Sequence, residues 1–297
     1  MRQEAYFCTV KELDELGKNN IPRQLISHTH LIYSSPATLA FNSPGAEGFG
    51  VKRAGLAVPD SVMLIVSPGC CGRNTSVLSS MRAYQDRFYY LLMDETDIVT
   101  GRHLKKIPKA VAEICEGLKK KPSVVMICIT CVDALLGTDM ERVCHKAEEY
   151  AGVPVRPCYM YALTREGRKP PMVHVRQSVY SLLEPKKKKG NVVNLLGYFS
   201  PLTDDCELYD LLHGAGVKTI HEISRCKDYA QYQTMSEANF NLVLHPEARF
   251  AAEDFHDRLK IPYIELRRLY QIDKIASQYR ALAAALGVEF EDEIPRK

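Results

Sequence analysis

Short runs of consecutive apolar residues alternate with amphipathic stretches along most of this chain. Four or five apolar residues in a row are typical of strands that are covered on both faces of a sheet. Between these runs, apolar residues recur at the spacing of amphipathic helices. We therefore expect strands at 62–66, 124–128, 153–155, 192–196, 217–220, 240–244 and 263–266. We expect helices at 77–88, 104–118, 208–212, 250–259 and 272–286, and one through Val143.

The order of these elements predicts the fold class. Strands that alternate with helices form parallel sheets through right-handed crossover connections. The sequence therefore predicts an α/β fold with two doubly wound, Rossmann-like parallel-sheet domains. The lysine run 186–189 follows Pro185 and precedes a new apolar run, so we interpret it as a solvated linker in preference to a phosphate-binding patch. We expect an N-terminal extension plus the first α/β domain in residues 1–188, and the second α/β domain in 189–297.

Composition and charge argue against several classes of protein. The 297 residues are 46% apolar and 25% charged, which is ordinary for a globular protein and excludes global disorder. The formal net charge of +3 is too small to indicate nucleic-acid binding. No apolar run reaches the roughly 18 residues that a membrane span requires. The N-terminus has no signal-peptide pattern, so we expect a cytoplasmic protein without a membrane or nucleic-acid partner.

Ten cysteines raise the question of redox chemistry or metal binding. Their density is far below that of a disulfide scaffold, and a reducing cytosol disfavours disulfide bonds. A free thiol packs as a small hydrophobic group. We expect this structural role for the cysteines that lie within apolar strand or helix patterns, namely Cys115, Cys144, Cys158 and Cys206.

Three loops that follow predicted strands carry reactive side chains. In open α/β sheets, ligands bind just beyond the carboxyl ends of the strands. The first two loops belong to one predicted domain, so Cys71 and Cys131 are expected at one edge of one sheet. Glycines beside the paired cysteines allow the backbone to approach a bulky group. The three loops contain, in chain order, Gly69, Cys70, Cys71 and Gly72; then Cys131; then His245.

Several thiol chemistries are compatible with this placement to different degrees. A nucleophilic cysteine needs a neighbouring base, and neither cysteine loop contains one. Cys128 and Cys131 have the spacing of a redox dithiol, but Cys128 falls inside an apolar strand. Zinc needs four clustered ligands, typically as two closely spaced pairs, and only one such spacing exists here. An iron–sulfur cubane also needs four ligands, and two chains related by a twofold axis can supply two thiolates each. On spacing alone, structural cysteines are the simplest interpretation and a shared cluster stays open.

The loop at 69–76 resembles a phosphate-binding loop only in part. It contains glycine, follows a predicted strand and precedes a predicted helix, but it lacks the Gly-Lys-Ser/Thr sequence that holds phosphate and magnesium. No Gly-x-Gly-x-x-Gly sequence follows a predicted strand. We therefore expect neither ATP hydrolysis nor a nicotinamide dinucleotide site in this chain.

Three sequence segments together resemble a known family. They are Ser-Pro-Gly-Cys-Cys at 67–71, Leu-Met-Asp-Glu-Thr-Asp-Ile-Val-Thr-Gly at 92–101 and Thr-Cys-Val-Asp-Ala-Leu-Leu-Gly-Thr-Asp at 130–139. Their order and approximate spacing are similar to those of the nitrogenase component 1 family. That family includes the α and β chains of the molybdenum–iron protein, cofactor-scaffold proteins, and reductases of chlorophyll and coenzyme F430 synthesis. The resemblance covers nearly the whole chain.

The resemblance implies roles for individual residues. Cys71 and Cys131 match cysteines that bind an iron–sulfur cluster in this family, and Cys70 is a second-choice ligand beside Cys71. His245 falls where the nitrogenase α chain has the cysteine that anchors its active-site cluster. An imidazole can bind a metal or donate a proton, and helix capping or an interface contact is an equally good expectation for His245.

The sequence also departs from the family pattern. No cysteine lies near 43–48, where the first cluster cysteine of the family is expected. The chain ends at Lys297, where larger relatives continue into a third α/β domain that completes the cofactor pocket. We therefore expect neither an enclosed iron–molybdenum cofactor nor dinitrogen reduction.

These observations lead to a functional hypothesis with two alternatives. We expect a nitrogenase-like reductase component that shares an iron–sulfur cluster, 4Fe-4S or larger, with a second copy or a homologous chain. An ATP-hydrolysing iron protein would supply electrons for reduction of an unidentified substrate near His245, where a second metal cofactor could sit in the inter-domain cleft. The first alternative is a non-catalytic scaffold or carrier of a metal cluster. The second is a two-lobed ligand-binding protein in which every cysteine is structural.

Overall fold

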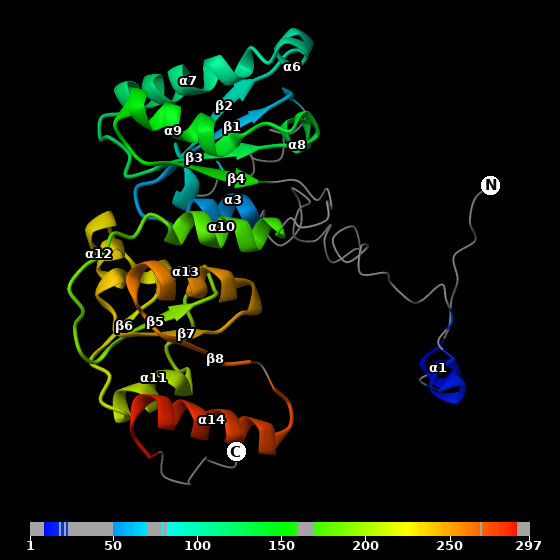
Figure 1. Ribbon diagram of the computed structural model, residues 1–297, viewed down its shortest axis with the longest axis vertical. Helices are drawn as coiled ribbons and strands as arrows, with labels where there is room; N and C mark the ends of the chain where they lie inside the picture. Colours follow the sequence, from blue (N-terminus) through cyan, green and yellow to red (C-terminus); the bar gives the residue numbers. More distant parts are fainter. Residues whose placement is uncertain are drawn as a thin grey trace.

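The computed structural model describes residues 9–17, 19–20, 22, 50–69, 79, 82–159, 169–267 and 269–289. Among these, a short N-terminal helix, α1 (Val10–Leu16), is capped by Thr9 and Glu12 in a reciprocal capping box. The other described elements form two parallel sheets with helices on both faces (Figure 1). This is the predicted α/β fold.

The first sheet has strand order β2-β1-β3-β4 and is parallel throughout. Its strands are β1 (Val62–Ser67), β2 (Phe88–Leu92), β3 (Val125–Ile129) and β4 (Val155–Tyr159). Every residue of β1 and β3 is buried, because these central strands are covered on both faces. On one face lie α7 (His103–Gly117) and α9 (Met140–Ala151), and on the other lie α3 (Gly50–Gly55) and α10 (Pro171–Tyr180) (Figure 1).

The second sheet repeats this arrangement with strand order β6-β5-β7-β8. Its strands are β5 (Val192–Leu196), β6 (Thr219–His221), β7 (Phe240–Val243) and β8 (Tyr263–Glu265). Helices α11 (Glu207–Gly214) and α14 (Ile272–Leu286) cover the face that points away from the first sheet, and α13 (Arg249–Leu259) covers the other (Figure 1). The remaining described elements are α6 (Glu95–Thr100), α8 (Cys131–Leu136), α12 (Tyr229–Gln233), η3 (Arg82–Tyr84), η4 (Ile223–Arg225), η5 (Thr234–Glu237) and η6 (Pro246–Ala248).

Helix α10 lies between the two halves and contacts both. One cluster of buried side chains runs from Met63 and Met126 of the first sheet, through Val175 of α10, to Phe255 of α13. The ring of Tyr180 packs on that of Phe255 with centroids 5.3 Å apart. Because this core is continuous, the carboxyl ends of strands in both halves are held in a fixed relation to α10.

Arg176 of α10 supplies the polar part of this junction. Its guanidinium donates two hydrogen bonds to the carbonyl oxygen of Gly197, at 3.1 and 2.7 Å, and one to Met172 O at 2.9 Å. It also donates to Glu247 Oε2 at 2.8 Å. Burial lowers the pKa of Arg176 and raises that of Glu247, so desolvation disfavours the charged form of both groups. A pair of this kind fixes geometry more than it adds stability.

Most of the predicted elements are present, and two differences stand out. The expected helix at 77–88 is wrong at its C-terminal end, since Tyr84 ends η3 and Phe88 begins strand β2. The run Phe-Tyr-Tyr-Leu-Leu favours a strand by its composition, and the helical spacing of Tyr84 and Phe88 hid this half-exposed edge strand. Helix α10 was not predicted, because eight of its ten residues are buried and the sequence shows no single apolar face.

The boundary expected at 188/189 falls within 181–191, where the chain forms neither helix nor strand. The division into two domains at that point stays a prediction. None of the described helices combines the length and the apolar character that crossing a lipid bilayer requires.

Candidate functional site

Two loops that carry predicted site residues begin side by side at one sheet edge. Strands β1 and β3 pair in register from Val62 opposite Val125 to Val66 opposite Ile129. The chain beyond β1 therefore leaves the sheet next to the chain beyond β3. Gly69 lies two residues past β1 and is exposed, and the backbone of Cys131 begins α8 directly after β3.

The thiols themselves are outside what the structure describes. Cys70, Cys71 and Gly72 lie outside the described residues, and for Cys131 only the backbone is described. Convergence of Cys71 and Cys131 on one cluster therefore stays a prediction. Within the described part of the chain, no group of three or more His, Cys, Asp or Glu side chains is arranged to hold a metal ion.

Three buried polar atoms at this sheet edge are left without partners. They are Ser67 Oγ at the end of β1, Thr130 Oγ1 just past β3, and Asp133 Oδ2 in α8, and none finds a hydrogen-bond partner among the described residues. Their residues are at most 2% exposed. Buried polar groups are normally satisfied, so each unsatisfied one requires an explanation, and a further bound group is one such explanation. The other unsatisfied buried atoms among the described residues belong to Tyr180, Asn194, Ser224 and Asn241. The three unsatisfied atoms lie at the sheet edge where the sequence predicts the cysteine loops.

The other carboxylate oxygen of Asp133 is held by a buried histidine. Nε2 of His103 lies 2.9 Å from Asp133 Oδ1, and its Nδ1 lies 3.0 Å from the carbonyl oxygen of Asp97. A carbonyl oxygen accepts only, so Nδ1 carries a proton. The contact between Nε2 and Asp133 Oδ1 then requires a proton between the ring nitrogen and the carboxylate. Because Thr138 Oγ1 also donates to Asp133 Oδ1 at 3.0 Å, the first turn of α8 after Cys131 is fixed from two sides.

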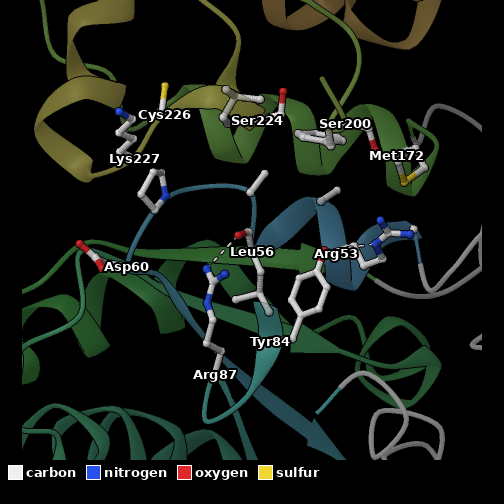
Figure 2. A pocket seen from close by; sticks show the side chains of 16 residues that line it. Arg53, Leu56, Asp60, Tyr84, Arg87, Met172, Ser200, Ser224, Cys226 and Lys227 are labelled. Atoms are coloured by element: carbon white, nitrogen blue, oxygen red, sulfur yellow. Dashed lines mark hydrogen bonds between the residues drawn. The ribbon is translucent and has the colours of Figure 1, made fainter. Parts of the chain in front are cut away.

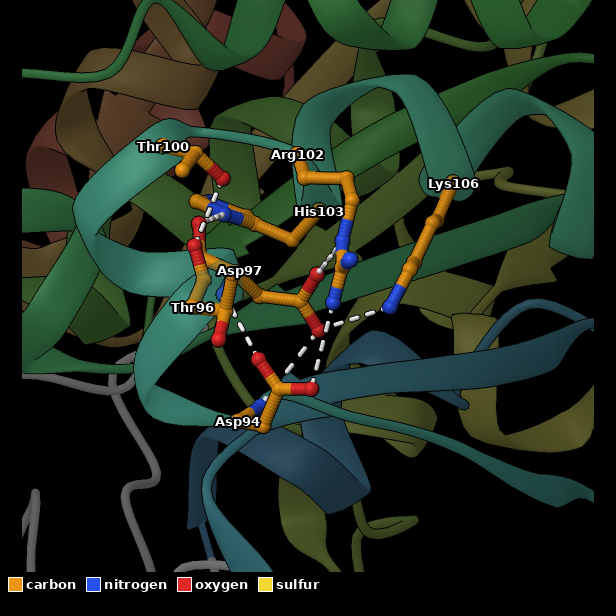
Figure 3. A network of polar contacts seen from close by, with 7 residues as sticks. All are labelled: Asp94, Thr96, Asp97, Thr100, Arg102, His103 and Lys106. Atoms are coloured by element: carbon orange, nitrogen blue, oxygen red, sulfur yellow. Dashed lines mark hydrogen bonds and ion pairs between the residues drawn. The ribbon is translucent and has the colours of Figure 1, made fainter.

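A charged network secures the segment that precedes His103 (Figure 3). Asp94 and Asp97 form a reciprocal capping box at the start of α6. Lys106 Nζ and Arg102 Nε each donate to the Asp97 carboxylate at 2.7 Å, which holds its pKa well below the usual range. The resemblance segment 92–101 thus serves to anchor α6 and α7 beside the sheet edge.

His245 lies at the corresponding edge of the second sheet. It is the N-cap of η6, and its Nδ1 accepts a hydrogen bond from the backbone N–H of Glu247 at 3.3 Å. Its ring makes an edge-on contact with Tyr198 at 5.7 Å. Gly197 has φ 137°, and a Cβ there would lie 2.7 Å from the backbone nitrogen of His245. Glycine is therefore required for the chain past β5 to pass this close to His245.

The redox-dithiol alternative does not fit the structure. Cys128 is fully buried inside β3, opposite Cys158 of β4. Cys144 is buried as well, and desolvation raises the pKa of its thiol. These three therefore fill the core, as expected. Cys206 occupies the N-cap position of α11 rather than its interior, and both Cys206 and Cys115 are half-buried and pack against the core.

A buried histidine beside the end of β4 was not identified from the sequence. His174 of α10 contacts the ring of Tyr159, the last residue of β4, edge-on at 4.3 Å. Burial lowers the pKa of His174 to about 4, so it is neutral at pH 7. The one available signal was Pro170-Pro171, since proline is favoured in the first turn of a helix.

Comparison with known proteins gives consistent matches. The family model for nitrogenase component 1 type oxidoreductases matches residues 47–297. The nitrogenase iron-molybdenum cofactor biosynthesis protein NifE of Nostoc sp. is 27% identical over 239 residues, which cover 77% of this chain and 49% of that protein. NifE of Klebsiella pneumoniae is 27% identical over 266 residues, with 82% and 58% covered. The chain thus spans about half the length of these curated relatives.

Solved structures of nitrogenase share the fold. The structure described as nitrogenase Cp1 at pH 6.5 matches with a TM-score of 0.61 and 18% identity, covering 82% of this chain and 58% of that one. The structure described as nitrogenase Cp1 at pH 5 matches with a TM-score of 0.57 and 21% identity, covering 80% and 51%. At these identities the likeness supports the fold alone, and it confirms the expected architecture.

Replacing His103 by leucine is expected to destabilise the protein by about 3 kcal/mol or more, because the Asp133 carboxylate then stays buried without its proton-sharing partner. Replacing Asp133 by leucine as well should recover part of that loss. Urea unfolding of the two single variants and the double variant measures the effect. Losses that simply add would contradict the coupling of the two side chains.

Replacing His174 by phenylalanine should flatten the acid side of the stability curve. His174 binds a proton near pH 6.5 in the unfolded chain and near pH 4 in the folded chain. Its contribution to stability is therefore complete above pH 6.5 and is lost as the pH falls toward 4. The expected loss is about 2–3 kcal/mol in the native chain and is absent in the variant. His256→Phe, which replaces an exposed histidine, is the control and should keep the native pH dependence. A pH dependence of stability in His174→Phe equal to that of the native chain would contradict the lowered pKa of His174.

Proposed function

The chain belongs to the nitrogenase component 1 type oxidoreductase family, and from this membership we propose that it holds an iron–sulfur cluster between two chains and serves as a scaffold for cofactor assembly. The carrying observation is the parallel pairing of β1 with β3, which starts the loops of Cys71 and Cys131 at one sheet edge. Each chain would offer two thiols there, and a cubane takes four ligands. A second copy or a homologous chain would complete the set, which needs no further sequence when the interface is twofold symmetric.

The donor set fits such a cluster chemically. Cys71 and Cys131 would supply thiolates, with Cys70 as the second choice at the first loop. When bound, an iron–sulfur cluster of 4Fe-4S or larger type supplies low-potential electron storage. The unpartnered hydroxyls of Ser67 and Thr130 would then have sulfur acceptors within their neighbourhood.

The scaffold role is favoured by the names of the curated relatives. Both NifE proteins described above are cofactor biosynthesis proteins, and a scaffold holds a metal cluster without turning over a substrate. Helix α8 is held through Asp133 by His103 and Thr138, and this support suits a site that holds a cluster in place. In the scaffold role, this support would keep Cys131 in place until the cluster is delivered to another protein.

A second candidate is the reductase role, which the oxidoreductase family description favours. In that case an ATP-hydrolysing iron protein would dock on the assembly and pass electrons through the cluster. His245 would lie beside the substrate or a second metal cofactor in the cleft between the two halves. Since its Nδ1 caps η6, any ligand or proton-donor role of His245 falls to Nε2.

Anaerobic purification with iron and sulfide analysis tests the cluster ligands. We expect a brown protein that loses most of its iron in Cys71→Ala and in Cys131→Ala, because neither site tolerates the loss of a thiolate. Cys115→Ala is the matched control, because it removes a half-buried cysteine of α7 that is not a proposed ligand. This variant should keep the full iron content. Full iron content in either ligand variant would overturn the assignment.

Transfer of labelled iron separates the scaffold from the reductase. The protein loaded with isotopically labelled iron should pass it stoichiometrically to cofactor-free nitrogenase component 1. It should show no repeated ATP-dependent reduction of protons or acetylene in the presence of a nitrogenase iron protein. Many turnovers with the iron retained would instead establish the reductase and exclude the scaffold.

A further inference from the structure

A cleft lies at the junction between the two halves, on the side of Arg176 that faces away from His245 (Figure 2). It has a volume of about 450 Å³, within the roughly 300–1,000 Å³ that is typical of small-molecule sites. One wall is formed by α3, the turn that follows it, and η3. The opposite wall is formed by the loops after β5 and β6.

Basic side chains outnumber acidic ones in the lining. Arg53, Arg87 and Lys227 contribute three cations, and Asp60 contributes one carboxylate. That carboxylate is already paired with Lys120 Nζ at 2.7 Å. Neither Arg53 nor Lys227 forms an ion pair with any residue that the structure describes. The cleft therefore carries a positive charge that its own lining does not neutralise.

Hydrogen bonding holds two of these groups in place. Arg87 donates to the carbonyl oxygens of Leu56 and Ser61 at 2.8 and 2.9 Å, which fixes the wall of the cleft. Arg53 Nε donates to the phenolic oxygen of Tyr84 at 3.2 Å. Since that oxygen accepts from Arg53, the phenol's own hydrogen is available to donate to a ligand. The positively charged wall is thus preorganised (Figure 2).

Apolar side chains complete the lining and give the cleft an amphipathic character. They include Leu56, Ala57, Met172, Phe199 and Ile223. Cys226 also lines the cleft, and burial raises the pKa of its thiol to about 11. At pH 7 this thiol is neutral, so it does not offset the positive charge.

The cleft is separate from the His245 site. Arg176 separates it from His245, because its guanidinium lies 5.0 Å from the ring of the lining residue Phe199 and also binds Glu247 on the His245 side. Gly69 and His245, the predicted site residues that the structure describes in full, do not line the cleft. Its ligand chemistry therefore does not depend on the proposed function.

We propose that this cleft binds a small organic anion that has an apolar body and a carboxylate or phosphate group. Arg53 and the donor hydrogen of Tyr84, which lie side by side on one wall, bind the anionic group, and Lys227 on the opposite wall adds to the positive potential of the cleft (Figure 2). The apolar body packs between Leu56 and Phe199. A charged group alone would leave these apolar surfaces unfilled, and a neutral body alone would leave the cations unpaired.

Titration of the full-length protein with 1-naphthyl phosphate and 1-naphthoate at low ionic strength tests the proposal. Calorimetry or probe fluorescence should show saturable one-to-one binding of one or both, and their order of affinity identifies the anionic group. Inorganic phosphate and 1-naphthol, which each lack one half of the recognised chemistry, should bind about ten-fold or more weakly. The Arg53→Gln/Lys227→Gln double variant should lose about ten-fold in affinity.

A matched control changes the same net charge elsewhere. Lys105→Gln/Lys146→Gln removes two exposed lysines of α7 and α9 and should leave probe binding unchanged. Ser200→Tyr, which fills the cleft without changing its charge, should block binding. Equal affinity for 1-naphthol, an unaffected double variant, or no binding of either anionic probe would overturn the proposal, whatever the iron content of the protein.

Discussion

Parallel pairing of β1 with β3 is the constraint on which the candidate site depends. Both strands are fully buried, and the helices packed on both faces of the sheet fix their position relative to each other. The shared register means that the chain leaves both strands at the same edge, first toward Gly69 and then into α8 at Cys131. Two loops that are distant in the sequence are thereby brought together without any direct contact between them being needed.

Helix α10 extends this constraint to the second sheet. Its apolar residues join the two cores, and Arg176 fixes the chain beyond β5 to the chain beyond β7 through Gly197 and Glu247. Both groups are disfavoured in charged form by burial, so their pairing serves position more than stability. The same helix separates the His245 edge from the basic cleft, which gives one scaffold two chemically different surfaces.

The central strands were predictable because their apolar residues are consecutive, and the long helices were predictable because their apolar residues recur at helical spacing. Strand β2 was missed because Phe88 and Tyr84 coincide with helical spacing and the strand lies at an edge. The position of the cysteine loops followed from strand order, whereas the support of α8 did not. His103 and Asp133 are 30 residues apart, and only the packing of α7 against the sheet edge brings them together. Likewise, nothing in the sequence indicates that Arg53 and Lys227 line the same cleft.

The central claim is that thiols from two chains meet at this sheet edge around one iron–sulfur cluster. Diffraction from anaerobically grown crystals, measured on both sides of the iron absorption edge, tests it most directly. The account predicts an anomalous peak at a contact between two chains, within bonding distance of Cys131 and Cys71 from each. Iron located elsewhere in the chain, or cysteine side chains that point away from any neighbouring chain, would contradict it.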